Sequence, residues 1–186
     1  IIFAGNDMLS KRILLSFVGS NDAGKLQGHP DGAIITALMN EKFDEIILLW
    51  NESKVGSPSY FEILSYLRKE ISKRKLANKV SDILLALTDV TDHNDIYNKL
   101  KKLTGALPKN KNIRYTAAIS SGTPSMQVCW ILLAESGDFS EEFPLRLIKV
   151  KDPKFGKAGN VVVKLDTSLP KILRLKDELE SIKKDL

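Results

Sequence analysis

Histidine and cysteine, the residues that most often carry metal sites and nucleophilic catalysis, are nearly missing from this sequence. Cys129 is the only cysteine among 186 residues, so neither a disulfide nor a cysteine metal site can form within one chain. This usage is typical of a reducing compartment such as the cytoplasm. His29 and His93 are the only histidines, and no metal-ligand spacing connects them. The sequence therefore predicts no metal, no cofactor and no recognisable base for a serine nucleophile.

Three common nucleotide-binding and hydrolase motifs are also missing. The dinucleotide fingerprint G-x-G-x-x-G does not follow the first predicted strand, and no G-x-S-x-G elbow occurs. The segment Gly19–Leu26, GSNDAGKL, approaches the phosphate-binding loop G-x-x-x-x-G-K-[ST]. However, Leu26 stands where a hydroxyl must bind Mg²⁺. A degenerate triphosphatase stays open as an alternative, and product formation from ATP would reveal it.

The composition is that of a globular domain with a basic surface. Hydrophobic residues make up 43% and charged residues 27%, so neither a disordered chain nor a fully membrane-embedded fold is indicated. The net charge is +5, and the sequence pI is about 9.2. Such an excess favours a polyanionic partner, so a binder of long nucleic acid is a second alternative. The length fits one domain.

Strand-like and helix-like apolar patterns alternate from Arg12 to Val150. Strands are predicted at 12–18, 44–50, 81–87, 113–119 and 145–150, and helices at 31–40, 59–77, 92–103 and 126–134. This alternation predicts an α/β fold, a Rossmann-like, open, mostly parallel sheet with helices on both faces. A C-terminal strand at 161–165, forming a hairpin, and a charged helix at 170–186 follow.

The stretch Ile113–Ala134 predicts a strand, a tight turn and a helix. Its turn, Ser120-Ser121-Gly122-Thr123-Pro124-Ser125, contains four hydroxyls and no bulky side chain. Thr123 can cap the helix, and Pro124 fits the first helical position, where a missing N–H costs nothing. A helix start of this kind leaves backbone N–H groups free to bind an anion. An ordinary turn that binds nothing is the alternative.

Two turns are expected to face each other across one crevice. In doubly wound sheets, ligands bind beyond the carboxyl ends of the strands, where the strand order reverses. The first and fourth strands flank that point in the usual order. Their turns are Gly19–Lys25 and Ser120–Ser125. Trp50 and Asn51, just beyond the second strand, could stack on and hydrogen-bond a base at the crevice edge.

The residue sequences of these turns resemble those of a known family. Gly19–Lys25 after the first strand, with Ile119-Ser-Ser-Gly-Thr-Pro-Ser-Met-Gln127 and the following Cys129–Glu135, is similar to the CARF family of CRISPR-associated Rossmann fold sensors. This version also looks like the sensor domain of regulators of RNA repair. The resemblance covers roughly Arg12 to Leu165.

The resemblance implies a homodimer, or a higher oligomer, that binds cyclic oligoadenylate across its twofold axis. The implied ring is most often cyclic tetra-adenylate, which is made in type III CRISPR antiviral defence. By position, Gly19, Ser20, Asn21, Asp22 and Ala23 would line one side of the ligand. The opposite side would be formed by Ser121, Gly122, Thr123, Pro124, Ser125 and Gln127, with Ser120 beside them and Lys25 as the nearest cation. Some relatives slowly cleave the ring, so a ring nuclease is an alternative to a sensor.

Family members couple the sensor to an effector. We expect residues 1–11, which open on Ile rather than Met, to be the remnant of an upstream segment or a linker. Residues 12–168 would form the sensor domain and 169–186 a C-terminal helix. A cytoplasmic sensor tethered to the inner membrane through an N-terminal membrane effector is one expectation. A transcriptional regulator of RNA repair is the other.

Overall fold

β1 (Lys11–Phe17) lies inside a six-stranded sheet whose strand order is β3-β2-β1-β4-β5-β6. The computed structural model describes residues 10–52, 56–135, 139, 142–151, 159–164, 178 and 180–183. The parallel neighbours of β1 are β2 (Glu45–Trp50) and β4 (Ile113–Ala118). Outside them lie β3 (Lys79–Leu84) and β5 (Leu145–Lys151), also parallel. Of the strands in the described part of the chain, β6 (Gly159–Val163) alone runs antiparallel, as the hairpin partner of β5.

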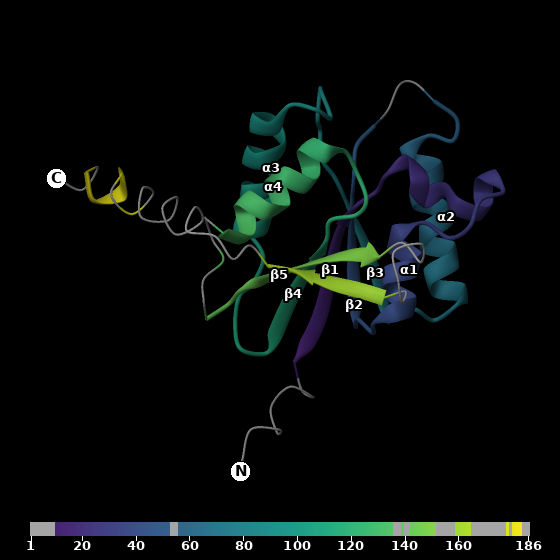
Figure 1. Ribbon diagram of the computed structural model, residues 1–186, viewed down its shortest axis with the longest axis horizontal. Helices are drawn as coiled ribbons and strands as arrows, with labels where there is room; N and C mark the ends of the chain where they lie inside the picture. The colour runs from purple at the N-terminus through teal and green to yellow at the C-terminus, as the bar shows by residue number, and fades with distance from the viewer. Residues whose placement is uncertain are drawn as a thin grey trace, which may run out of the picture.

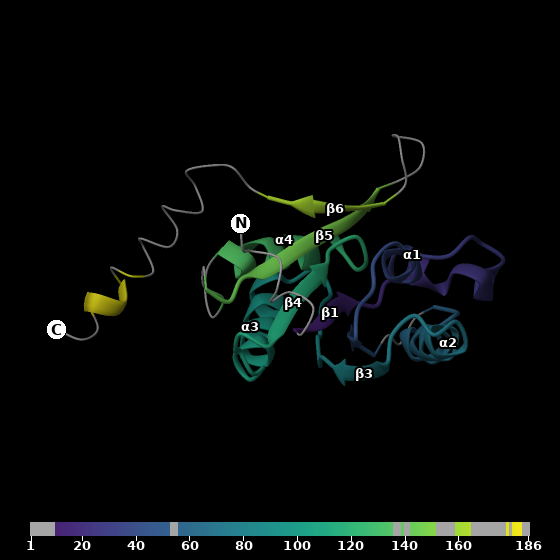
Figure 2. The same ribbon diagram turned by 90° about the horizontal axis from the view of Figure 1, so that it is seen from below.

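Helices cover both faces of this sheet, as the sequence predicted. α1 (Ala33–Asn40) and α2 (Tyr60–Lys73) lie on one face. The other face carries α3 (His93–Gly105) and α4 (Pro124–Glu135) (Figures 1 and 2). Consecutive side chains of a strand point to opposite faces, so β1 supplies both cores. Leu15 and Phe17 pack toward α3 and α4, and Leu14 packs toward α1 and α2.

The predicted elements are found, with shifted ends. The helix predicted at 59–77 ends at Lys73, because Arg74 caps it and Lys75 adopts a left-handed φ of 54°. The third strand begins at Lys79 rather than 81. A 3₁₀ helix, η2 (Ser20–Gln27), forms most of the turn after β1. The predicted C-terminal helix lies outside the described residues except for 178 and 180–183, which are helical.

Glu41, just after α1, accepts hydrogen bonds from side chains of three strands, β1, β5 and β6. Arg146 of β5 donates to its carboxylate at 2.6 Å, and Arg12 of β1 donates to the same oxygen. Asn160 of β6 donates to Glu41 Oε2 at 3.3 Å and to the Ala37 carbonyl at 3.0 Å. The β5–β6 hairpin is therefore fixed against the C-terminal end of α1.

Candidate functional site

The turns after β1 and β4 touch each other, as predicted. The strand order reverses between these two neighbouring strands, so both turns leave the same edge of the sheet. A Cβ built on Gly19 would lie 2.7 Å from the backbone nitrogen of Gly122. Gly122 itself has a φ of +94°, a conformation that other residues rarely adopt. Glycines at both positions therefore allow the two backbones to approach this closely.

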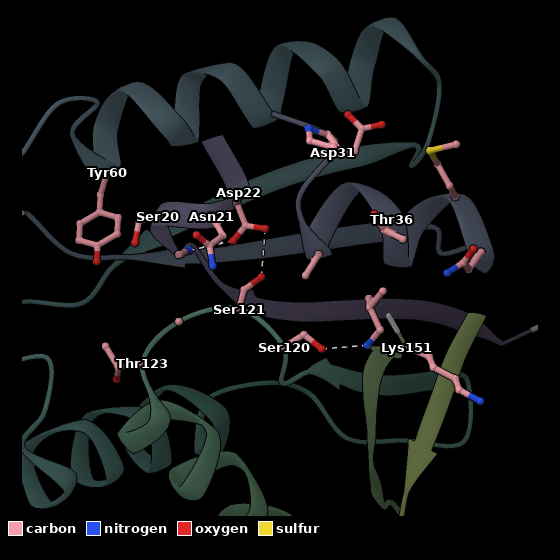
Figure 3. A pocket seen from close by; sticks show the side chains of 17 residues that line it. Ser20, Asn21, Asp22, Asp31, Thr36, Tyr60, Ser120, Ser121, Thr123 and Lys151 are labelled. Atoms are coloured by element: carbon pink, nitrogen blue, oxygen red, sulfur yellow. Dashed lines mark hydrogen bonds between the residues drawn. The ribbon is translucent and has the colours of Figure 1, made fainter. Parts of the chain in front are cut away.

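A cleft of about 690 Å³ opens where the turns meet (Figure 3). η2 and α1 form one wall, and the turn after β4 and the end of β5 form the other. Both Ser20 and Thr123 line it, so the two turns share one cavity. The lining residues are Gly19, Ser20, Asn21, Asp22, Pro30, Asp31, Ala33, Thr36, Met39, Asn40, Tyr60, Ser120, Ser121, Gly122, Thr123, Val150 and Lys151.

The predicted site residues divide into two groups. Gly19, Ser20, Asn21, Asp22, Ser120, Ser121, Gly122 and Thr123 line the cleft. Its lining does not include Ala23, Lys25, Trp50, Asn51, Pro124, Ser125 or Gln127. Trp50, expected to stack on a base, instead donates its indole N–H to Asp82 at 3.1 Å and packs against the ring of Phe61.

Asp22 holds three segments of the cleft together. Its carboxylate accepts hydrogen bonds from Gly19 N (2.9 Å), Ile34 N (3.1 Å) and Ser121 Oγ (3.0 Å). Asp22 is only 1% exposed. Burial raises the pKa of this carboxyl above its ordinary value, and the three donors lower it in part. Asp22 therefore positions both turns and the start of α1, and its carboxylate oxygens face protein donors.

Most hydroxyls of the turn after β4, here called the second turn (120–125), already donate to protein acceptors. Thr123 Oγ1 donates to the Val90 carbonyl (2.8 Å), and Ser125 Oγ donates to the Thr91 carbonyl (2.9 Å). The predicted cap is present, since Thr123 Oγ1 also accepts from Met126 N at 3.3 Å. Ser120 differs, because its oxygen accepts from Val150 N at 2.8 Å and its own proton meets no acceptor among the described residues. These hydroxyls mainly shape the turn.

Lys151 is the one cation among the described residues that line the cleft. It lies at the end of β5 and has no carboxylate partner within the described part of the chain. Lys25, the cation expected from sequence, is not part of the lining, although its Nζ lies 3.9 Å from the lining residue Asp31; its side chain is 61% exposed. The carboxyl end of β5 reaches the same edge of the sheet as β1 and β4. This position is the sequence signal that could have identified Lys151.

Asp31, the acidic side chain opposite, is neutralised by Arg74. The guanidinium of Arg74 contacts both carboxylate oxygens, at 2.8 and 3.0 Å. This pair holds the pKa of Asp31 below its ordinary value, so the carboxylate stays charged at neutral pH. Asp31 therefore repels an anionic ligand less than a carboxylate without a paired cation would.

Neither the cysteine nor the histidines of this chain lie beside the hydroxyls of the cleft. Cys129 lies in α4, where burial raises the pKa of its thiol to about 11, and its Sγ contacts the His93 carbonyl at 3.4 Å. Neither histidine lines the cavity. Within the described residues, no three His, Cys, Asp or Glu side chains gather closely enough to hold a metal ion. The lining of the cleft thus offers hydroxyl, amide and backbone groups and, among the described residues, the cation of Lys151.

No helix in the described part of the chain combines the length and the apolar character needed to cross a membrane.

Comparisons with known proteins give a family and a fold. The family model described as RtcR, regulator of RNA terminal phosphate cyclase, matches residues 35–185. Among solved structures, Enterococcus italicus Csm6 bound to cyclic hexa-2′-fluoro-hexa-dAMP matches with a TM-score of 0.68 and 14% sequence identity. That match covers 93% of this chain and 46% of the Csm6 chain, so this chain spans less than half of its relative's length. No curated protein matches the sequence.

Proposed function

Since this chain belongs to the family of regulators of RNA terminal phosphate cyclase, we propose that its cleft binds a cyclic oligoadenylate and that occupancy is relayed to an attached effector. Cyclic tetra-adenylate, the ring of type III CRISPR defence, is the ligand that we propose. The observation that carries the proposal is the meeting of the two turns in one cleft of about 690 Å³. The structurally similar Csm6 was solved with a cyclic hexanucleotide analogue, which supports the ligand class.

The available polar groups in the cleft suit a phosphodiester. Lys151 supplies a positive charge, and the Ser120 hydroxyl can donate beside it. The side chains of Ser20 and Asn21 are exposed and make no hydrogen bond to any described residue. Charge-assisted hydrogen bonds to phosphate oxygens are among the stronger polar contacts. Adenine bases would contact the remaining apolar lining.

The family name favours a transcriptional regulator of RNA repair as the attached effector. A membrane effector was the other expectation from sequence, and the family match gives it no support. Under this proposal the ligand acts as a signal, and a ring nuclease remains the competing function for the same cleft. Chromatography of the ring after long incubation with the protein separates these two functions, because only a nuclease yields linear fragments.

A symmetric ring suits a twofold dimer, and α4 offers a surface for one. Its sequence is apolar on nearly every side, yet only one side packs against the sheet, through residues such as Met126, Trp130 and Leu133. On the outer side Val128 is 42% exposed. α4 begins directly after Thr123, which lines the cleft. Pairing of two copies through α4 would therefore bring their clefts close together.

Binding of the ring is the first test of the proposed function. Calorimetry is expected to show tight binding of cyclic tetra-adenylate and much weaker binding of linear tetra-adenylate. If four phosphates are engaged, log affinity should fall with log salt concentration with a slope of about −3. Equal and weak heats for both ligands would contradict the proposal. Tight binding of long RNA without preference for rings would favour the nucleic-acid binder instead.

Substitution of Lys151→Ala should weaken ring binding by about tenfold and make the salt slope shallower by about 0.7, because one phosphate loses its countercharge. Lys149→Ala is the matched control, since Lys149 is an exposed lysine of the same strand that does not line the cleft. Calorimetry at several salt concentrations measures both effects. An equal response of the two variants would mean that only the general basic field matters.

Substitution of Val128→Asp should shift the protein from dimer to monomer, because it places a charge in the proposed α4 contact. Val162→Asp is the matched control, since Val162 on β6 is 41% exposed against 42% for Val128. Sedimentation velocity over a concentration series measures the change. A Val128→Asp protein that dimerises like the control would place the dimer contact elsewhere.

A further inference from the structure

A second, smaller cavity adjoins the cleft at the start of α2. Its volume is about 200 Å³, and its lining includes Ser20, Gln27, Ser57, Pro58, Tyr60 and Ile63. Ser20 and Tyr60 also line the main cleft, so Tyr60 stands between the two spaces. Figure 3 shows Tyr60 beside Ser20 at one end of the cleft. A ligand in the cleft can therefore extend one group into this side cavity.

The lining combines flat apolar surfaces with one amide. Tyr60 offers an aromatic ring and Pro58 a second apolar surface, while Ile63 behind them is only 1% exposed. Gln27 ends η2, and its exposed amide makes no hydrogen bond to any described residue. It thus presents one donor group and one acceptor that no other described side chain occupies.

We propose that the side cavity is an adenine-recognition subsite, in which Tyr60 stacks on the base and the Gln27 amide pairs with its N6 and N7 edge. This inference rests on the proposed function and deepens it by naming the residues that read the base. A glutamine amide matches adenine with two hydrogen bonds, accepting from the N6 amino group and donating to N7. Aromatic side chains stack on bases with a gain in binding free energy similar to that of such a hydrogen-bonded pair.

The same geometry disfavours guanine and hypoxanthine. Both carry O6, an acceptor, where adenine carries its N6 amino donor. Gln27 can donate an amide hydrogen to either O6 or N7 of these bases, but its carbonyl oxygen then faces the other of the two acceptors. One hydrogen bond is lost and one repulsive contact appears, so the subsite selects adenine over 6-oxopurines.

The test compares cyclic tetra-adenylate with cyclic tetra-inosinate by calorimetry. The wild-type protein should bind the adenylate ring at least about tenfold more tightly. Gln27→Met, which keeps the length of the side chain but removes its polar pair, should abolish that preference. Tyr60→Ala should weaken binding by about tenfold or more, whereas Tyr60→Phe, which keeps the ring, should bind as the wild type does. Leu26→Ala is the control, since Leu26 is exposed and lines neither cavity.

The outcomes separate this inference from the proposed function. If the wild type prefers the adenylate ring and Gln27→Met keeps the same preference, the base is read elsewhere and the inference is wrong, while ring binding stands. If neither ring binds, the proposed function fails, and the subsite is judged by NMR titration with AMP and IMP. Shifts that are specific to AMP and disappear in Gln27→Met would then support the subsite. No shifts, or equal shifts for both nucleotides, would overturn it.

Discussion

Replacement of Asp22 by alanine is expected to lower the free energy of unfolding by about 3 kcal/mol, because three donors lose a buried acceptor. The donors are Gly19 N, Ile34 N and Ser121 Oγ, at 2.9 to 3.1 Å. For a domain of this size, the melting temperature should fall by about 6–12 °C. Ring binding should weaken by more than tenfold, since the two turns must then be ordered at the expense of binding energy. Urea unfolding and calorimetry measure the two effects.

Asp95→Ala is the control for this substitution. Asp95 is an acidic residue of α3 whose partner, Lys99, lies one turn away at the surface. Its removal should cost no more than about 0.5 kcal/mol and leave ring binding unchanged. If Asp22→Ala were as mild as the control, Asp22 would not hold the cleft together.

The burial of Asp22 also predicts a dependence on pH. Its pKa in the folded protein is raised above the ordinary value of 3.8, so the folded state takes up the proton at a higher pH than the unfolded chain does. The folded state therefore gains stability, relative to an Asp22→Asn variant, as the pH falls from neutral toward about 4. Unfolding of both proteins at pH 8, 6 and 4.5 tests this sign. If the wild type instead lost stability relative to the Asp22→Asn variant as the pH fell, the three donors would outweigh burial.

Gly32→Ala is expected to destabilise the protein by about 2–3 kcal/mol and to weaken ring binding by about tenfold. A Cβ at this position would lie 2.6 Å from the Cα of Asp22 and 2.7 Å from the Asn21 carbonyl oxygen. Both contacts are with backbone, so η2 must move away from α1, and η2 forms a wall of the cleft. Thermal unfolding and calorimetry report the two losses.

Gly159→Ala is the matched control, because nothing lies within 4 Å of a Cβ at Gly159 and no left-handed φ is involved. This variant should unfold and bind as the wild type does. A Gly32→Ala protein with unchanged binding would show that the first turn can shift without altering the cleft.

The order of the elements and the family were predictable from sequence, because they depend on short-range patterns. Alternating apolar runs predicted the doubly wound sheet, and the observed strand order confirms it. The residue sequence of the two turns indicated a CARF sensor domain, with a membrane effector and a regulator of RNA repair both left open. The comparisons confirm the CARF recognition, and the family model is of the regulator type. The reversal of strand order then placed both turns at one edge, which the shared cleft bears out.

The direction of individual side chains was less predictable. Asn21 and Asp22 are adjacent and both polar, yet Asn21 is exposed and Asp22 is buried against donors from α1 and the second turn. Likewise, Thr123 and Ser125 donate to carbonyls at 90 and 91, which belong to a loop more than thirty residues earlier in the chain. Such partners depend on tertiary contacts that no local pattern contains.

The internal hydrogen bonds of the second turn have a kinetic consequence. Ser121, Thr123 and Ser125 are held by protein acceptors before any ligand arrives. A rigid receptor surface loses little rotamer freedom on complex formation, so association should need no slow rearrangement there. Variants that loosen the turn should then differ from the wild type mainly in the residence time of the ligand.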